Sequence, residues 1–142
     1  SLKVYFYPYL QSRFIYYFYR IIKSEFRHTS IQDFKFEKVL SKDIVDIINK
    51  SKVVVDIQHP AQSGLTMRTL EMIGMKKKLI TTNKDVTEYD LYNQNNIMII
   101  DRTHPVLDFN FFKAVYKELE KDKYEYYSLG RWCLDVLGVG EC

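Results

Sequence analysis

Cysteine is scarce in this sequence, and both copies, Cys133 and Cys142, stand near its end. Two such residues form no disulfide framework, so we expect a reduced, cytoplasmic setting. Long apolar runs are also lacking, which excludes a membrane-spanning helix in the printed sequence. No internal repeat or low-complexity segment interrupts the chain.

Several motifs that identify common enzyme classes are missing. The sequence has no GxGxxG, GxxxxGK[ST], GxSxG or CxxC pattern, which argues against dehydrogenases, P-loop NTPases, serine hydrolases and thiol oxidoreductases. The three histidines lie far apart without metal-ligand spacing, so no metal site is predicted. A formal net charge of +3 is too small to indicate a nucleic-acid partner.

The remaining composition is that of an ordinary globular chain. Its 142 residues are 46% hydrophobic and 27% charged, which suits one domain with a sizeable core. We therefore predict a single domain over 1–142, in which residues 124–138 form a carboxyl-terminal helical tail.

Strands and helices are predicted to alternate along the chain. Short β-branched or aromatic runs predict strands, and apolar residues at helical spacing predict helices. The expected strands are 2–9, 34–40, 52–57, 78–82 and 97–100, and the expected helices are 13–25, 42–49, 67–73 and, with a break near Tyr127 and Gly130, 109–137.

This alternation predicts an α/β fold: a three-layer, Rossmann-like, mostly parallel sheet with helices on both faces. The three consecutive valines of KVVVDI predict a strand buried on both faces. In such folds ligands bind beyond the carboxyl ends of the strands, where the strand order reverses.

The stretch SGLTMRTLEMIG, from Ser63 to Gly74, follows that valine-rich strand and begins the next helix. Gly64 allows a ligand to approach the backbone closely, and the amides from Leu65 to Arg68 lie at the positive end of the helix dipole. The hydroxyls of Ser63 and Thr66 can add contacts to a phosphate. Glu71, one turn further on, can accept hydrogen bonds from ribose hydroxyls.

A plainer interpretation of the same stretch is also open. Ser63 and Thr66 are ordinary helix caps, and Glu71 is spaced to pair with Arg68. In the preceding loop, His59 and Gln62 are candidates for contact with phosphate or base, although a loop histidine is more often hydrogen-bonded within its own loop. Lys76, Lys77 and Lys78 are expected to form a solvated face after the helix.

The stretch SGLTMRTLEMIGMKKKLITTN, preceded by KVVVDIQHP and followed by YDLYNQNNIMIIDR, resembles the carboxyl-terminal, nucleotide-sugar-binding half of bacterial GT-B glycosyltransferases. These enzymes build capsular polysaccharide and lipopolysaccharide. The resemblance is carried by the Gly-containing loop, the helix and the Leu-Glu-Met-Ile-Gly pattern that ends at Gly74. It extends from about Phe34 to Ile100 and more loosely to Gly138.

The resemblance implies a GT-B carboxyl-terminal domain in which Glu71 binds the ribose and the amides from Gly64 to Thr66 bind the diphosphate. Arg13 is the candidate basic contact to donor phosphate. It further implies a metal-independent glycosyltransferase without a cofactor, in which a separate amino-terminal domain binds a glycan or lipid-linked acceptor. We do not assign enzyme activity to this chain alone.

Ser63 stands eight positions before Glu71, where retaining members of the class often carry an acidic residue. The stereochemical outcome therefore stays open, and no catalytic residue is assigned. The alternative function is a non-catalytic, flavodoxin-like or receiver-like α/β module that binds a protein or a ligand.

Aromatic residues are concentrated near the start of the chain. Phe14, Phe18 and Ile21 fall on one helical face, which predicts a helix packing on a sheet. Because Arg13 and Arg20 lie among these aromatics, peripheral association with the inner face of a membrane remains the other interpretation.

Overall fold

The computed structural model describes residues 3–139, and Cys142 therefore lies outside the described part. The chain divides into two compact units between Val45 and Asp46, within helix α2 (Ser41–Lys50). We call them the amino-terminal unit and the carboxyl-terminal unit and describe each by itself. The expectation of a single domain stays a prediction.

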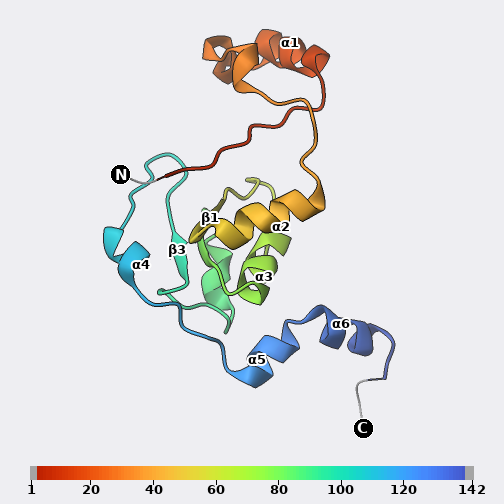
Figure 1. Ribbon diagram of the computed structural model, residues 1–142, viewed down its shortest axis with the longest axis vertical. Helices are drawn as coiled ribbons and strands as arrows, with labels where there is room; N and C mark the ends of the chain where they lie inside the picture. Colours follow the sequence, from red (N-terminus) through yellow and green to blue (C-terminus); the bar gives the residue numbers. More distant parts are fainter. Residues whose placement is uncertain (1–2, 140–142) are drawn as a thin grey trace. The chain divides into compact units, whose positions relative to one another are not determined.

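The amino-terminal unit is built from α1 (Arg13–Ile22) and two short 3-10 helices, η1 (Ser24–His28) and η2 (Ile31–Asp33) (Figure 1). The Ser12 hydroxyl accepts a hydrogen bond from the Ile15 amide and so caps α1. The helix ends earlier than predicted, because Lys23 takes an extended conformation with φ −105° and ψ 120°.

The two strands predicted in this unit are wrong for the described residues. Segments 3–9 and 34–40 form one parallel bridge, between Tyr9 and Lys35, and the Tyr7 hydroxyl donates to the Glu37 carbonyl at 2.8 Å, but neither segment is a strand. Val4, Tyr5 and Phe6 are exposed. Strand propensity reflects packing against neighbours, and these side chains have no sheet face to pack on.

Tyr16 is the centre of the amino-terminal unit and is fully buried. Its ring lies 5.5 Å from that of Phe34 and 6.4 Å from that of Phe26, while its hydroxyl donates to the Thr29 carbonyl at 2.7 Å. The Tyr16 ring thus packs in an aromatic core, while the Thr29 carbonyl supplies the hydrogen-bond partner that its buried hydroxyl needs.

The prediction that Phe14, Phe18 and Ile21 pack on a sheet is also wrong. All three are exposed, and the described part of the amino-terminal unit contains no sheet beyond the single bridge. The core of the unit uses Tyr16, on another side of the helix, so the helical spacing identified an apolar face but not its partner.

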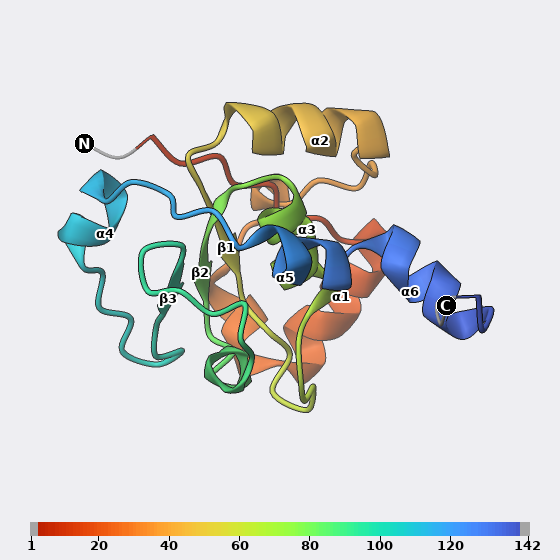
Figure 2. The same ribbon diagram turned by 90° about the horizontal axis from the view of Figure 1, so that it is seen from below.

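The carboxyl-terminal unit is α/β, as predicted, with a small parallel sheet of three strands (Figures 1 and 2). After α2 its elements are β1 (Val53–Asp56), α3 (Met67–Gly74), β2 (Lys78–Thr81), the 3-10 helix η3 (Asp85–Glu88), β3 (Ile97–Ile99), α4 (Phe109–Lys113), α5 (Lys121–Tyr126) and α6 (Leu129–Val136). The predicted strands 78–82 and 97–100 are therefore present, each shorter by one residue at its end.

The most buried strand is β2, which lies between β1 and β3 and is buried at all four residues. The prediction that the valine-rich strand is buried on both faces is wrong. Val55 is 57% exposed, and β1 is an edge strand among the strands that the structure describes. A run of valines therefore indicated a strand correctly but not its place in the sheet.

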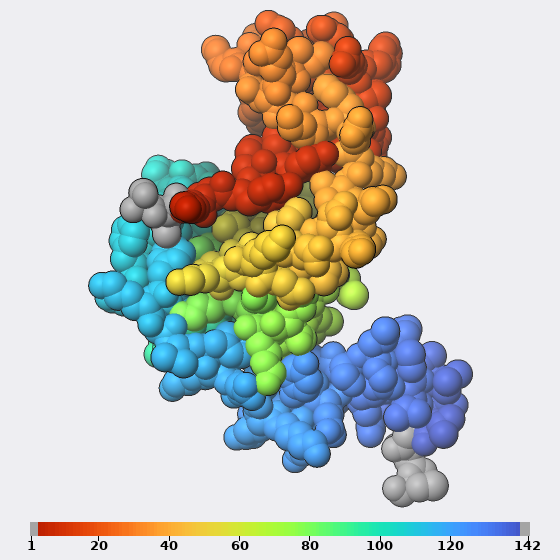
Figure 3. Space-filling model, viewed as in Figure 1, coloured from red at the N-terminus to blue at the C-terminus, as the bar shows by residue number. Residues whose placement is uncertain are grey.

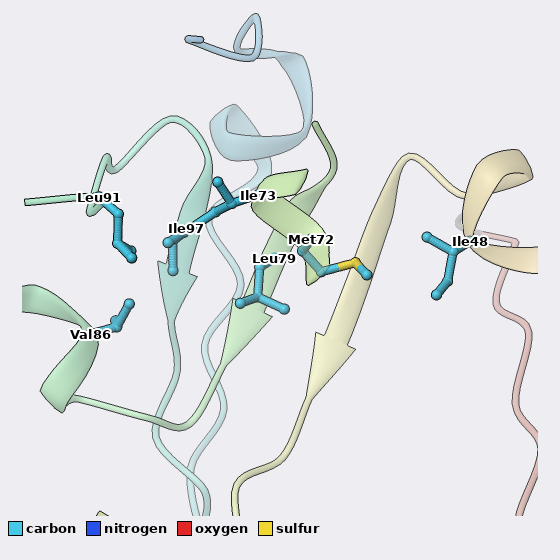
Figure 4. Packing of buried hydrophobic residues seen from close by; sticks show 7 residues of the cluster. All are labelled: Ile48, Met72, Ile73, Leu79, Val86, Leu91 and Ile97. Carbon is cyan, nitrogen blue, oxygen red and sulfur yellow. The ribbon is translucent and has the colours of Figure 1, made fainter. Parts of the chain in front are cut away.

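The core of this unit lies between the sheet, α3 and the segments after β2 (Figure 4). Leu79 of β2 and Ile97 of β3 pack with Met72 and Ile73 of α3. Helix α3 contacts both β1 and β2. Because the apolar face of α3 is buried against two strands, the position of this helix relative to the sheet is fixed. The helix begins at the end of the loop that follows β1.

The boundaries of α3 follow from local chemistry. The buried Thr66 hydroxyl accepts from the Thr69 amide at 3.1 Å, as expected of a cap. Gly74 is the last helical residue, and the left-handed residue after the helix is Lys76, with φ 52°. The Lys77 amide then donates to the Met72 carbonyl, which closes the helix end.

Lys78 departs from the solvated face predicted for the three lysines. Its side chain is buried, its ammonium donates to the Phe111 and Ala114 carbonyls, and it lies over the Phe111 ring. Burial lowers the pKa of this ammonium. The carbonyls supply the partners that a buried cation needs.

Within residues 3–139, none of the helices has both the length and the apolar character needed to cross a membrane.

Candidate functional site

An open hollow of about 340 Å³ lies at the carboxyl edge of the sheet. Asp56, Thr81 and Ile99, the last residues of the three strands, are in register at this edge. The hollow is lined by residues that follow each strand: Gln58, His59, Pro60, Gln62, Thr82, Lys84, Asp85, Ile100, Asp101 and Arg102. This is the edge at which parallel α/β sheets bind ligands.

The strand order differs from the arrangement expected for such a site. The three strands lie in sequence order, so no reversal of order occurs among the strands that the structure describes. The position of the hollow therefore follows from the three loops that meet there.

The loop after β1 is shaped by its own hydrogen bonds. The Gln58 side-chain amide donates to the Gln62 carbonyl at 2.6 Å, and His59 Nδ1 accepts from the Ala61 amide at 3.2 Å. The Gln58 backbone amide donates to the Thr82 hydroxyl and so ties the loop to the end of β2. Among the sequence-predicted site residues, His59 and Gln62 line the hollow.

Gly64 has φ +74°, a conformation that glycine adopts without strain. Its amide already donates to the Asp85 carboxylate at 3.0 Å, and its carbonyl accepts from the Asn83 side chain at 2.7 Å. A phosphate bound at the Gly64 amide would displace a carboxylate. The Gly64 amide is thus already occupied by a partner within the fold.

Thr66 is occupied within the fold. Its hydroxyl donates to the Asp56 carboxylate at 2.8 Å and accepts from the Thr69 amide. Leu65 is half-buried against the core, and Ser63 is exposed in the loop. Among these three residues, Ser63 has its side chain in the most accessible position.

Glu71 lies on the exposed side of α3 and pairs with Arg68 at 2.6 Å. This pairing agrees with the interpretation of Glu71 as a helix-surface residue that pairs with Arg68. An exposed pair of this kind contributes less than about 1 kcal/mol, so Glu71 has little structural importance. Neither Glu71 nor Arg68 lines the hollow.

Arg13 belongs to α1 in the amino-terminal unit, where its guanidinium lies 5.7 Å from the centre of the Phe36 ring. The structure thus gives this residue a local aromatic partner. Its expected contact with donor phosphate stays a prediction.

Lys84 and Arg102 are site residues that the sequence reasoning missed. Both line the hollow, and neither takes part in an ion pair among the described residues. Arg102 donates to the Gln58 carbonyl and so holds the loop after β1. The signal that points to them is their position two residues after the predicted strands 78–82 and 97–100.

A second hollow, of about 470 Å³, runs along β3 and α4. Its lining residues include no Lys, Arg or His, whereas the hollow at the carboxyl edge has all three types. Asp85 and Asp101 also line the hollow at the carboxyl edge, so it offers an anionic ligand two cations beside two carboxylates, whereas the second hollow offers no cation.

Asp101 is an acidic group of this hollow with firm partners of its own. Its carboxylate accepts from the Thr103 hydroxyl at 2.6 Å and from the amides of His104 and Thr103. These bonds favour the ionised form and lower the pKa of Asp101 to about 2. The Asp101 negative charge is thus held by the loop after β3.

Replacing Thr103 with Val should raise the Asp101 pKa from about 2 toward its ordinary value of 3.8, because the largest stabilising contact is lost while both amides remain. An NMR titration of the side-chain carboxyl measures the change. Thr87→Val is the control, since the Thr87 hydroxyl donates to the Lys84 carbonyl instead. An unchanged Asp101 pKa in Thr103→Val would show that the Thr103 hydroxyl does not cause the low pKa of Asp101.

Within the described residues, no three His, Cys, Asp or Glu side chains gather in a way that could hold a metal ion. The expectation of a metal-independent site stays a prediction. Comparisons with protein-family models, with curated proteins and with solved structures give no match to this chain.

Proposed function

We propose that the carboxyl-terminal unit binds a nucleoside-diphosphate sugar and serves as the donor half of a GT-B glycosyltransferase of bacterial surface polysaccharide synthesis. The observation that carries the proposal is the hollow at the carboxyl edge of a parallel sheet, with Lys84, Arg102 and His59 around it. In this proposal the sheet belongs to a Rossmann-like domain, and an acceptor domain lies elsewhere in the full protein.

The diphosphate would occupy the hollow. Lys84 and Arg102 offer positive charge that no carboxylate neutralises within ion-pair distance in the described chain. Charge-assisted hydrogen bonds of this kind are about twice as strong as neutral ones. The same groups stabilise the leaving diphosphate as its charge develops during sugar transfer.

Glu71 would accept hydrogen bonds from the ribose hydroxyls. Its side chain is exposed on α3, and among the described residues its one ion-pair partner is Arg68 on the same helix. Because an exposed pair of this type is weak, a ligand can replace one of its contacts at small cost.

Thermal melting tests the proposal with UDP, GDP, CDP, ADP and dTDP, each without added metal. A ligand at about 100 times its dissociation constant stabilises the folded state by about 2.7 kcal/mol, which raises the melting midpoint by roughly 5 to 10 °C at this size. We expect one diphosphate to produce this shift, and we expect Lys84→Ala and Glu71→Gln each to reduce it.

Lys52→Ala is the matched control for Lys84→Ala. Lys52 is exposed and directly precedes β1, so it lies at the opposite edge of the sheet from the hollow. Its substitution should leave the nucleotide shift unchanged. If every variant melts alike with and without nucleotide, the donor-binding proposal fails and the non-catalytic module becomes the better interpretation.

A further inference from the structure

Helix α1 presents an apolar face to solvent. Phe14 is 79% exposed and Ile21 is 77% exposed. This α1 face consists of Phe14, Tyr17, Phe18, Ile21 and Ile22, all of them exposed. At 3.6 residues per turn these positions cover an arc of about 140°, so they form one continuous stripe along the helix.

The amino-terminal unit does not use this face for its own core. Tyr16, the buried residue of α1, points into the aromatic cluster with Phe26 and Phe34. Ser12 caps the start of the helix, and the Lys23 amide donates to the Tyr19 carbonyl at its end. The helix is therefore anchored by other contacts, and the α1 face is left free.

The charges carried by α1 and the residues that flank it all have one sign. From Ser12 to Ser24 the chain carries Arg13, Arg20 and Lys23 and no acidic residue. Arg13 and Arg20 fall together on the helix, beside the Tyr17 edge of the face. The first 45 residues contain eight Lys and Arg against four Asp and Glu, so the basic excess of the whole chain lies here.

We propose that the α1 face inserts into the surface of an anionic lipid bilayer, with the helix lying in the membrane plane. Phe14, Phe18 and Ile21 would enter the boundary between headgroups and acyl chains. Arg13 and Arg20 would reach lipid phosphates from the side of the helix, as long basic side chains do at membrane surfaces.

The charge pattern favours lipid over a second copy of the chain. Two α1 faces brought together would pair two helices that carry only positive charge, which is unfavourable. An anionic bilayer instead supplies both an apolar layer for the aromatic rings and negative charge for the arginines. Figure 3 shows the atoms of the segment that contains α1, coloured red to orange.

Cosedimentation of the full chain with vesicles tests the proposal. One set of vesicles contains phosphatidylcholine alone, and the other contains about one third phosphatidylglycerol. We expect binding to the anionic vesicles that weakens as salt is added. Arg13→Gln with Arg20→Gln should weaken it by roughly fivefold for each cation removed, and Phe14→Ser with Phe18→Ser by at least about tenfold.

A double variant in α6, Leu129→Ser with Trp132→Ser, is the matched control, because it also removes two exposed apolar side chains. It should keep vesicle binding. The Phe14 and Phe18 variant should melt at the unchanged temperature, since neither residue is buried.

Three results would overturn the proposal. The first is equal binding of the parent chain and the Phe14 and Phe18 variant to anionic vesicles. The second is a lower melting midpoint in that variant, which would place the face inside the fold. The third is a dimer, detected by light scattering, that the same variant dissociates.

Discussion

Leu79→Ala should lower the free energy of unfolding by about 2 to 5 kcal/mol, the range for a buried leucine truncated in a core. Leu79 is 1% exposed and lies in β2, between the two other strands. It packs in one cluster with Met72 and Ile97. These neighbours on α3 and β3 hold the surrounding atoms in place, which limits collapse into the cavity. Urea denaturation monitored by circular dichroism measures the loss.

Val55→Ala is the control for this substitution. Val55 lies in the adjacent strand β1, and the strand register sets it beside Ile80. Its side chain is largely exposed, so truncation removes little buried surface and should cost well under 1 kcal/mol. Equal losses in Leu79→Ala and Val55→Ala would contradict the assignment of β2 as the central strand.

The sequence predicted the middle of the fold well. The apolar runs at Lys78 and Ile97 mark strands β2 and β3, and Thr66 marks the start of α3. These features depend on local chemistry: β-branched residues in a short run, and a hydroxyl that accepts from the first helical amides. The structure places each of them within a residue or two of the prediction.

The sequence could not identify partners. Val4, Tyr5 and Phe6 have high strand propensity, yet the described part of the amino-terminal unit offers them no sheet to join. Phe14 and Ile21 have helical spacing, yet their face is open. Propensity and periodicity describe a surface on one element, whereas packing needs a second surface, and nothing in the spacing states where that surface lies.

The candidate site was predictable in position and less so in composition. The loop after β1 was placed correctly at the carboxyl edge, and His59 and Gln62 line the hollow. Lys84 and Arg102 come from the loops after β2 and β3, and only the parallel register brings those loops beside the first one. Glu71 lies outside the lining of the hollow. Helical spacing predicted which face of α3 carries Glu71, but it could not predict the distance from Glu71 to the loop.

Asn83 is the residue whose loss should affect this site most, although its own side chain does not line the hollow. It is 1% exposed. Its side chain donates to the Gly64 carbonyl at 2.7 Å and accepts from the Asp85 amide at 2.9 Å. Because the Gly64 amide in turn donates to the Asp85 carboxylate, the three residues form a closed ring of hydrogen bonds.

Asn83→Ala should therefore lower the free energy of unfolding by about 2 kcal/mol, since the Gly64 carbonyl and the Asp85 amide both lose their partner. Urea denaturation measures the loss. Asn49→Ala, at an exposed position of α2, is the control and should change stability by less than about 0.5 kcal/mol. A loss in Asn83→Ala no larger than in this control would show that the ring does not hold the two loops together.

Asn83→Ala also tests whether Asn83 positions the residues that bind the nucleotide without contacting it. At a temperature where Asn83→Ala remains folded, any weakening of nucleotide binding must come from displacement of Gly64 and of the segment with Lys84, because Asn83 is not in the lining. We expect the dissociation constant to rise in Asn83→Ala and to stay unchanged in Asn49→Ala, as measured by titration calorimetry. If binding is unchanged while stability falls, the ring serves the fold alone, and the diphosphate contacts must come from Lys84 and Arg102 without help from the Gly64 loop.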